Sequence, residues 1–100
     1  MPKGYVILTE AIKDQDGMDA YSRASTRALV ESRAKVLSVD TRPEVLEGEW
    51  HGDRTVVVEF ESVEAARAWY ESASYREAKP LRLAAADSNV VILSGFELPT

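Results

Sequence analysis

Residues 54–60 read Arg-Thr-Val-Val-Val-Glu-Phe and form the clearest β-strand pattern of the chain. Three consecutive valines and a phenylalanine favour extended backbone, because branched and aromatic side chains pack well on a pleated surface. Ser62 follows, and its hydroxyl can accept from the free backbone N–H groups at the start of a helix. The segment therefore predicts a strand followed by a helix that runs to about Ala73.

Working outward, the same patterns predict three more strands and a second long helix. Apolar residues at spacings of three and four indicate a helix over residues 18–32. A short helix is expected from Ser74, and Pro80 separates it from a further turn at 81–86. The sequence at 44–50 is compatible with a continuation of the second strand beyond Pro43, before a hairpin tip at 51–53. The three strands are expected at residues 4–12, 35–41 and 89–97.

The order β-α-β-β-α-β is that of a ferredoxin-like α+β sandwich, in which two helices cover one face of a four-stranded sheet. Side chains alternate between the two faces, and both sets are apolar here: Tyr5 and Ile7 oppose Val6 and Leu8. A face in contact with water alternates to polar residues. We therefore expect a homodimer in which a second copy covers the open face. A monomer with an exposed apolar face is the alternative.

Composition fits one globular domain over residues 1–100, with 45% hydrophobic and 29% charged residues. The absence of cysteine excludes disulfides, cysteine zinc sites and thiol catalysis. The net charge of -5 argues against a nucleic-acid partner. The apolar runs are far shorter than the ~20 residues of a membrane span, and the first residues lack a signal-peptide core. We expect a cytoplasmic protein that binds no nucleic acid and no membrane.

Two stretches resemble the DUF1330 family: residues 42–50, Arg-Pro-Glu-Val-Leu-Glu-Gly-Glu-Trp, and residues 57–70. Residues 3–7, 74–75 and 81–87 agree with the same family, so the resemblance covers nearly the whole chain. It implies a dimeric α/β barrel, built from two ferredoxin-like subunits whose sheets face each other. The family name denotes an unknown function. Related barrels include monooxygenases, isomerases and degradative enzymes, so the resemblance implies room for a small-molecule pocket without a defined chemistry.

The chain departs from the family pattern near the end of the second predicted strand. Many members carry an arginine and two glycines there, at the positions of Val39, Asp40 and Thr41. Many also carry two glycines at the positions of Arg33 and Ala34. The resemblance leaves open whether the nearby Arg42 replaces the arginine missing at Val39.

The candidate catalytic residues are His51, Glu59 and Arg82. His51 is the only histidine, and it can act as an acid or base if its loop covers a pocket; a solvated loop residue is the alternative. Glu59 lies within an apolar strand, so it must be paired or functional. We expect Arg54 or Arg82 as its partner. The candidate ligand-binding residues are Glu47, Trp50, Arg82 and Asp87.

No motif calls for a cofactor or a metal. The acidic turn at residues 14–19 lacks the glycine and glutamate of a calcium loop, and no phosphate-binding glycine loop is present. We expect a cofactor-independent small-molecule enzyme or ligand-binding protein, with its pocket between helices and sheet, bounded by residues 47–51 and 75–87. A non-catalytic dimeric binding or regulatory module is the alternative. A further alternative, if Met1 is removed, is a tautomerase that uses the amine of Pro2.

Overall fold

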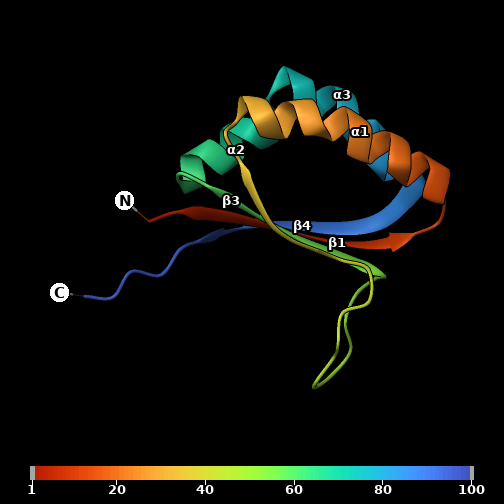
Figure 1. Ribbon diagram of the computed structural model, residues 1–100, viewed down its shortest axis with the longest axis horizontal. Coiled ribbons are helices and arrows are strands. Elements are labelled where there is room, and N and C mark those ends of the chain that lie inside the picture. The colour runs from red at the N-terminus through yellow and green to blue at the C-terminus, as the bar shows by residue number, and fades with distance from the viewer. Residues whose placement is uncertain (1, 100) are drawn as a thin grey trace.

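The computed structural model describes residues 2–99, which form one sheet with three helices on one of its faces (Figure 1). The sheet is antiparallel, with strand order β2-β3-β1-β4. This is the predicted ferredoxin-like α+β arrangement, with a third helix added. The elements are β1 (Gly4–Ile12), α1 (Gln15–Glu31), β2 (Lys35–Asp40), β3 (Arg54–Phe60), α2 (Val63–Glu71), α3 (Ala73–Ala85) and β4 (Ala86–Ser94).

Short polar side chains fix the start of each helix. The carboxylate of Asp14 accepts from the backbone N–H of Gly17 at the start of α1, with a donor–acceptor distance of 3.2 Å. Ser62 accepts from the backbone N–H of Ala65 at the start of α2, as expected, at 3.0 Å. Ser72 begins α3 in the same way. Each bond satisfies a backbone donor that has no partner within its helix.

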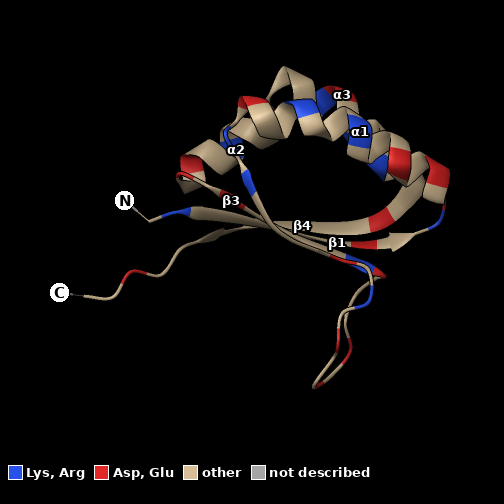
Figure 2. Cartoon of the chain, viewed as in Figure 1, with Lys and Arg blue, Asp and Glu red and all other residues tan. Residues whose placement is uncertain are grey.

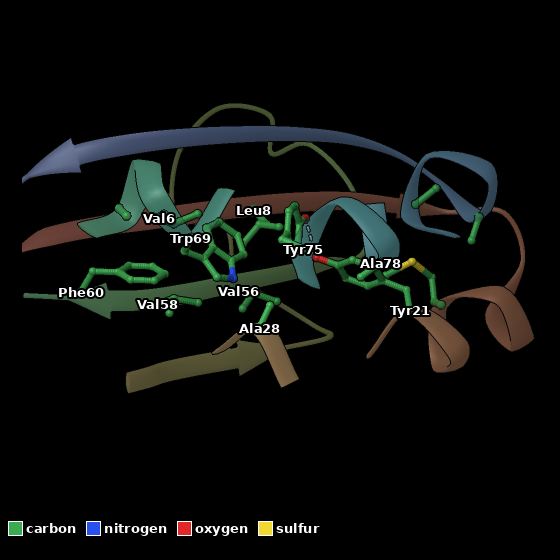
Figure 3. Packing of buried hydrophobic residues seen from close by; sticks show 14 residues of the cluster. Val6, Leu8, Tyr21, Ala28, Val56, Val58, Phe60, Trp69, Tyr75 and Ala78 are labelled. Atoms are coloured by element: carbon green, nitrogen blue, oxygen red, sulfur yellow. Dashed lines mark hydrogen bonds between the residues drawn. The ribbon is translucent and has the colours of Figure 1, made fainter. Parts of the chain in front are cut away.

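The core lies between the sheet and the helices (Figure 3). Alternate residues of β1 and β3 point toward the helices, among them Val6, Val58 and Phe60. The indole of Trp69 packs between Phe60 and Tyr75, with ring centroids 5.3 Å and 4.3 Å away. Trp69 is therefore a core residue, in agreement with its place on the apolar border of the predicted second helix.

Several boundaries differ from the sequence predictions. α1 begins at Gln15, three residues early, because Asp14 rather than a later residue caps it. α3 runs unbroken through Pro80, which is exposed. β4 covers residues 86–94 rather than 89–97, because its pairing with β1 begins opposite Ile12 and ends opposite Gly4.

The prediction of a strand at 44–50 is wrong. Residues 41–53 form a long loop, called the arm here, that projects from the sheet on the side away from the helices (Figure 1). Several acidic residues of the arm lie toward its tip, whereas Asp53 lies at its base (Figure 2). Gly48 has a φ of +74°, which ordinary residues avoid, and most of the arm is exposed. A strand there has no neighbour in the sheet to pair with.

The sheet face opposite the helices is bare and has an apolar middle, with polar residues such as Thr9, Glu59 and Asp87 around it. It carries Ile7 and Val57, which are half-buried, and Val91 and Leu93, which are exposed. The expected alternation thus gives an apolar helix-facing side and a bare side of mixed polarity with an apolar middle. Among residues 2–99, no helix is long and apolar enough to cross a membrane.

Candidate functional site

A cavity of about 170 Å³ lies between the sheet and the helices. It is comparable to a cavity of about 150 Å³ that holds a benzene molecule. Two of its lining residues, Val36 and Val39 of β2, are about half exposed, so the cavity opens to solvent along this edge strand. Its walls are mainly apolar, with polar groups from three elements: Leu8, Glu10, Tyr21, Ser22, Ser25, Leu29, Val36, Val39, Arg54, Val56, Val58 and Trp69.

Glu10 is the charged residue buried deepest in this wall. It follows Val6 and Leu8 on the face of β1 that points to the helices, and its exposure is 0%. Arg54 lies directly opposite in the antiparallel pairing of β1 with β3. Its Nε lies 3.1 Å from Oε1 of Glu10. Within the described chain, neither carboxylate oxygen has a hydrogen-bond partner of good geometry, and Arg54 Nε has none either.

Burial raises the pKa of Glu10 above its ordinary value. The charges of Arg54 and Arg82 act in the opposite direction, but removal from water outweighs them. A buried carboxyl with a raised pKa in the wall of a cavity is a typical proton donor or acceptor in an active site.

The base of the arm fixes the backbone at Glu10. The N–H of Asp53 donates to the carbonyl of Glu10 at 2.8 Å. The carboxylate of Asp53 accepts from the N–H of Ile12 at 2.9 Å. Gly52 has a φ of +83°, and a Cβ at this position would lie 2.5 Å from the Glu10 carbonyl. Glycine is therefore required for the arm to approach β1 so closely.

A second polar group, centred on Arg82 of α3, lies in the same layer. Its Nε donates to the hydroxyl of Tyr75 at 3.2 Å, and its Nη1 donates to the hydroxyl of Ser88. The hydroxyls of Tyr75 and Tyr21 lie 2.8 Å apart (Figure 3). Burial, together with Tyr75, raises the pKa of Tyr21. This network joins α1, α3 and β4, and through Tyr21 it reaches the cavity wall.

The expected ion pair between Glu59 and an arginine is wrong. The side chains of β3 alternate, so Arg54 shares the helix-facing side with Val56 and Val58, whereas Glu59 points to the bare face. There Glu59 accepts a hydrogen bond of 3.1 Å from the hydroxyl of Tyr5. This bond raises the pKa of Tyr5. Arg54 pairs with Glu10 instead.

The structure brings three other candidates together, but on the bare face. Nδ1 of His51 lies 2.7 Å from the hydroxyl of Thr9, and its Nε2 lies 3.7 Å from the carboxylate of Asp87. Trp50 donates from Nε1 to the hydroxyl of Thr55 at 2.8 Å. A role for His51, Trp50 and Asp87 in binding or catalysis stays a prediction.

The four predicted polar groups therefore do not form one site. Arg82 lies on the helix side of the sheet, opposite to His51 and Asp87. Glu47 lies in the exposed part of the arm, where it lines a shallow hollow with Trp50 and their neighbours. The cavity does lie between helices and sheet, but α1, α2 and the first three strands line it.

Sequence reasoning missed Glu10, although a signal existed. Gly4, Val6, Leu8 and Glu10 fall on one strand face, so the carboxyl ends an apolar stripe. Val39, where many family members have arginine, lines the cavity, whereas Arg42 is exposed in the arm and does not. Arg54 is the cation of the cavity wall. Across residues 2–99, no group of three or more histidine and acidic side chains is arranged to hold a metal ion.

Comparison with known proteins agrees with this architecture. The model of the family described as "Domain of unknown function (DUF1330)" matches residues 3–96. None of the curated proteins compared matches the chain. The solved structure of RPA0582, a protein of unknown function from Rhodopseudomonas palustris, is similar with 22% identity and a TM-score of 0.80, over 97% of this chain and 85% of that chain.

Two more distant structures share the fold. One is a dimeric protein of unknown function and ferredoxin-like fold from Bacteroides fragilis, with 10% identity and a TM-score of 0.63, over 92% of this chain and 95% of that one. The other is SnoaB, a cofactor-independent oxygenase from Streptomyces nogalater, with 7% identity and a TM-score of 0.69, over 98% and 97% of the two chains. The family match covers all seven elements, and the chain belongs to the DUF1330 family.

Proposed function

We propose that this chain is a homodimeric enzyme that binds a small organic molecule in the cavity and exchanges a proton with it through Glu10, without a cofactor. The observation that carries this proposal is the state of Glu10. It is fully buried in the cavity wall, and within residues 2–99 neither of its oxygens has a hydrogen bond of good geometry, although Oε1 forms an ion pair with Arg54. A buried charged group that lacks well-formed hydrogen bonds loses free energy of hydration, so such groups call for a functional explanation.

The surroundings of Glu10 suit proton transfer. Its raised pKa brings its two protonation states closer in free energy near neutral pH, which is what a proton shuttle needs. Arg54 stands next to it and can hold an oxygen atom of a ligand that becomes negative during the reaction. The description of SnoaB as a cofactor-independent oxygenase supports chemistry without a cofactor on this fold.

Dimer formation rests on the bare sheet face. Its apolar residues have no cover within the described chain, and the similar protein from Bacteroides fragilis is described as dimeric. Trp50 and His51, from the base of the arm, lie over the same face, and they extend the surface that a second copy would bury. We also propose a cytoplasmic location. We propose no nucleic-acid partner, because the net charge is -5 and the basic residues are interleaved with acidic ones.

A thermal-shift screen of small organic molecules tests the binding part of the proposal. We expect some compounds to raise the melting temperature of the wild type. Val39→Phe narrows the open side of the cavity at a half-exposed position, so it should fold and lose the shift. Leu83→Phe, at an exposed position of α3, is the matched control and should keep the rise in melting temperature. If the compounds raise the melting temperature of both variants equally, the ligand binds outside this cavity.

A non-catalytic binding or regulatory module is the second candidate. The observation in its favour is that Arg54 already lies 3.1 Å from Glu10, so the carboxylate has a charge partner without any chemistry. Turnover of a bound compound distinguishes the enzyme from the non-catalytic module. If the chain is the proposed enzyme, Glu10→Gln abolishes turnover while the compound still binds. Pro2 is exposed and does not line the cavity, so the proposal does not use its amine.

A further inference from the structure

The buried charges on the helix side of the sheet do not balance. Glu10 is 0% exposed and Arg82 is 2% exposed, while the Arg54 side chain is 17% exposed. Two cations thus face one carboxylate. Within residues 2–99, Glu10 and Arg54 form an ion pair, but Arg82 forms none. Such an excess of buried charge is unfavourable unless a further negative group compensates it.

The partners of Arg82 are neutral. Tyr75 and Ser88 offer hydroxyl oxygens to its N–H groups, and the ring of Tyr21 lies 5.9 Å from its guanidinium carbon. These contacts satisfy donors of Arg82 without supplying a negative charge, because the acceptors are hydroxyl groups and not carboxylates. The positive charge of Arg82 is therefore not neutralised by its hydrogen-bond partners, and it adds to the positive potential between the sheet and the helices.

Arg54 has donors that are free to bind a further acceptor. Its Nη1 and Nη2 atoms each lie 3.4 Å from the hydroxyl of Ser22, which is long for a hydrogen bond. Its Nε has no partner of good geometry within the described chain. Nε is buried against Glu10, but Arg54 lines the cavity and its side chain is 17% exposed, so Nη1 and Nη2 are the donors that a molecule inside the cavity can reach.

The apolar lining and the volume of the cavity limit which molecules can bind in it. Leu8, Leu29, Val36, Val56 and Val58 contribute apolar surface, and the volume of about 170 Å³ suits a single ring or a short branched chain. A ligand that binds both the donors of Arg54 and the apolar lining has one negative end and an otherwise apolar structure.

Building on the proposed function, we propose that the ligand of this cavity is a small organic monoanion, such as a monocarboxylate, whose charged oxygens bind Arg54 while its apolar body lies among the leucines and valines. The anion restores the charge balance that Glu10 alone leaves incomplete. It also places an apolar carbon skeleton next to the carboxyl of Glu10.

The test compares two probes of the same shape by isothermal titration of the full chain: benzoate, which is negative, and benzamide, which is neutral. We expect benzoate to bind about tenfold more tightly or better, because both partners of its hydrogen bonds to Arg54 are charged, whereas the amide of benzamide is neutral. Arg54→Gln should remove this preference. Arg23→Gln, with the same change of charge at an exposed position of α1, is the control and should keep it.

Glu10→Gln gives an independent result with the opposite sign. Glu10 is the only buried acidic residue among residues 2–99, so removing its carboxylate should strengthen benzoate binding and leave benzamide binding unchanged, even if Arg54→Gln fails to fold. Circular dichroism confirms that each variant is folded. Equal binding of the two probes, or weaker benzoate binding by Glu10→Gln, would overturn the inference and leave the proposed small-molecule function in place. If neither probe binds, the inferred anion site and the proposed small-molecule function are both overturned for ligands of this size.

Discussion

Glu10 occupies a position where a hydrophobic residue would serve the fold better. It continues the stripe of Val6 and Leu8 toward the helices, and its pairing with Arg54 offsets only part of its loss of hydration. Replacing a buried ion pair by well-packed apolar residues is often neutral or stabilising. Stability alone therefore does not account for a carboxyl at this place, whereas a role in the cavity does.

The raised pKa of Glu10 leads to a prediction about stability and pH. A carboxyl whose pKa is higher in the folded than in the unfolded chain binds its proton more tightly when folded. The stability that this proton contributes is fully present below the ordinary value of 4.5, and it is lost as the pH rises through the folded pKa. In Glu10→Gln this contribution is absent.

Urea unfolding of both proteins between about pH 4 and pH 8 measures the effect. The free energy of unfolding of the wild type, minus that of Glu10→Gln, should fall as the pH rises above 4.5. A difference that rises with pH would mean that attraction to Arg54 outweighs burial, so that the pKa is lowered.

At the scale of the elements, local patterns predicted the strands well and the site poorly. The valines of residues 54–60 and the cap at Ser62 are local signals, and the structure has both β3 and α2 where they indicate. The ion pair of Glu10 with Arg54 depends on the register between two strands that are far apart in the sequence, since residues 10 and 54 are 44 positions apart. No local pattern encodes that register, so the wrong partner was assigned to Arg54.

Pro80 shows the converse, a local signal that the tertiary structure overrides. Proline removes a backbone hydrogen bond and clashes with the preceding turn, which predicts a break. Yet α3 continues through it, because Tyr75, Ala78, Arg82 and Ala85 on the two sides are buried and hold the helix against the sheet and α1. Packing of an apolar face contributes more to a helix in a protein than intrinsic propensity does.

The exposed position of Pro80 within α3 makes Pro80→Ala a stabilising change. We expect the free energy of unfolding to increase by about 1–3 kcal/mol, since proline is about 3 kcal/mol less favourable than alanine inside a helix and its stiffness in the unfolded chain recovers part of this. Chemical denaturation measures it. A loss of stability would instead show that α3 needs a bend at Pro80 for Tyr75 and Arg82 to reach their partners.

At the scale of the whole molecule, the three helices cover one face of the sheet and leave the other to the arm and to solvent (Figure 1). The two faces have separate chemistry. The helix side contains the cavity with Glu10 and Arg54, whereas the bare side carries His51, Asp87 and an apolar surface. A dimer through the bare face leaves the opening of the cavity along β2 on the helix side of each subunit, so binding and assembly use different surfaces.

The assembly of the chain can be measured in solution. At micromolar concentration, light scattering coupled to size exclusion should give twice the mass of a single chain, because an apolar sheet face of this size favours burial against a second copy. Leu93→Lys places a charge on the bare face and should give the mass of one chain. Leu83→Lys is the matched control, since Leu83 is also exposed but lies on α3 at the helix side, and it should remain a dimer. A single-chain mass for the wild type would contradict the dimer. Dissociation of Leu83→Lys but not of Leu93→Lys would mean that the copies meet through their helices and that the bare face serves another partner.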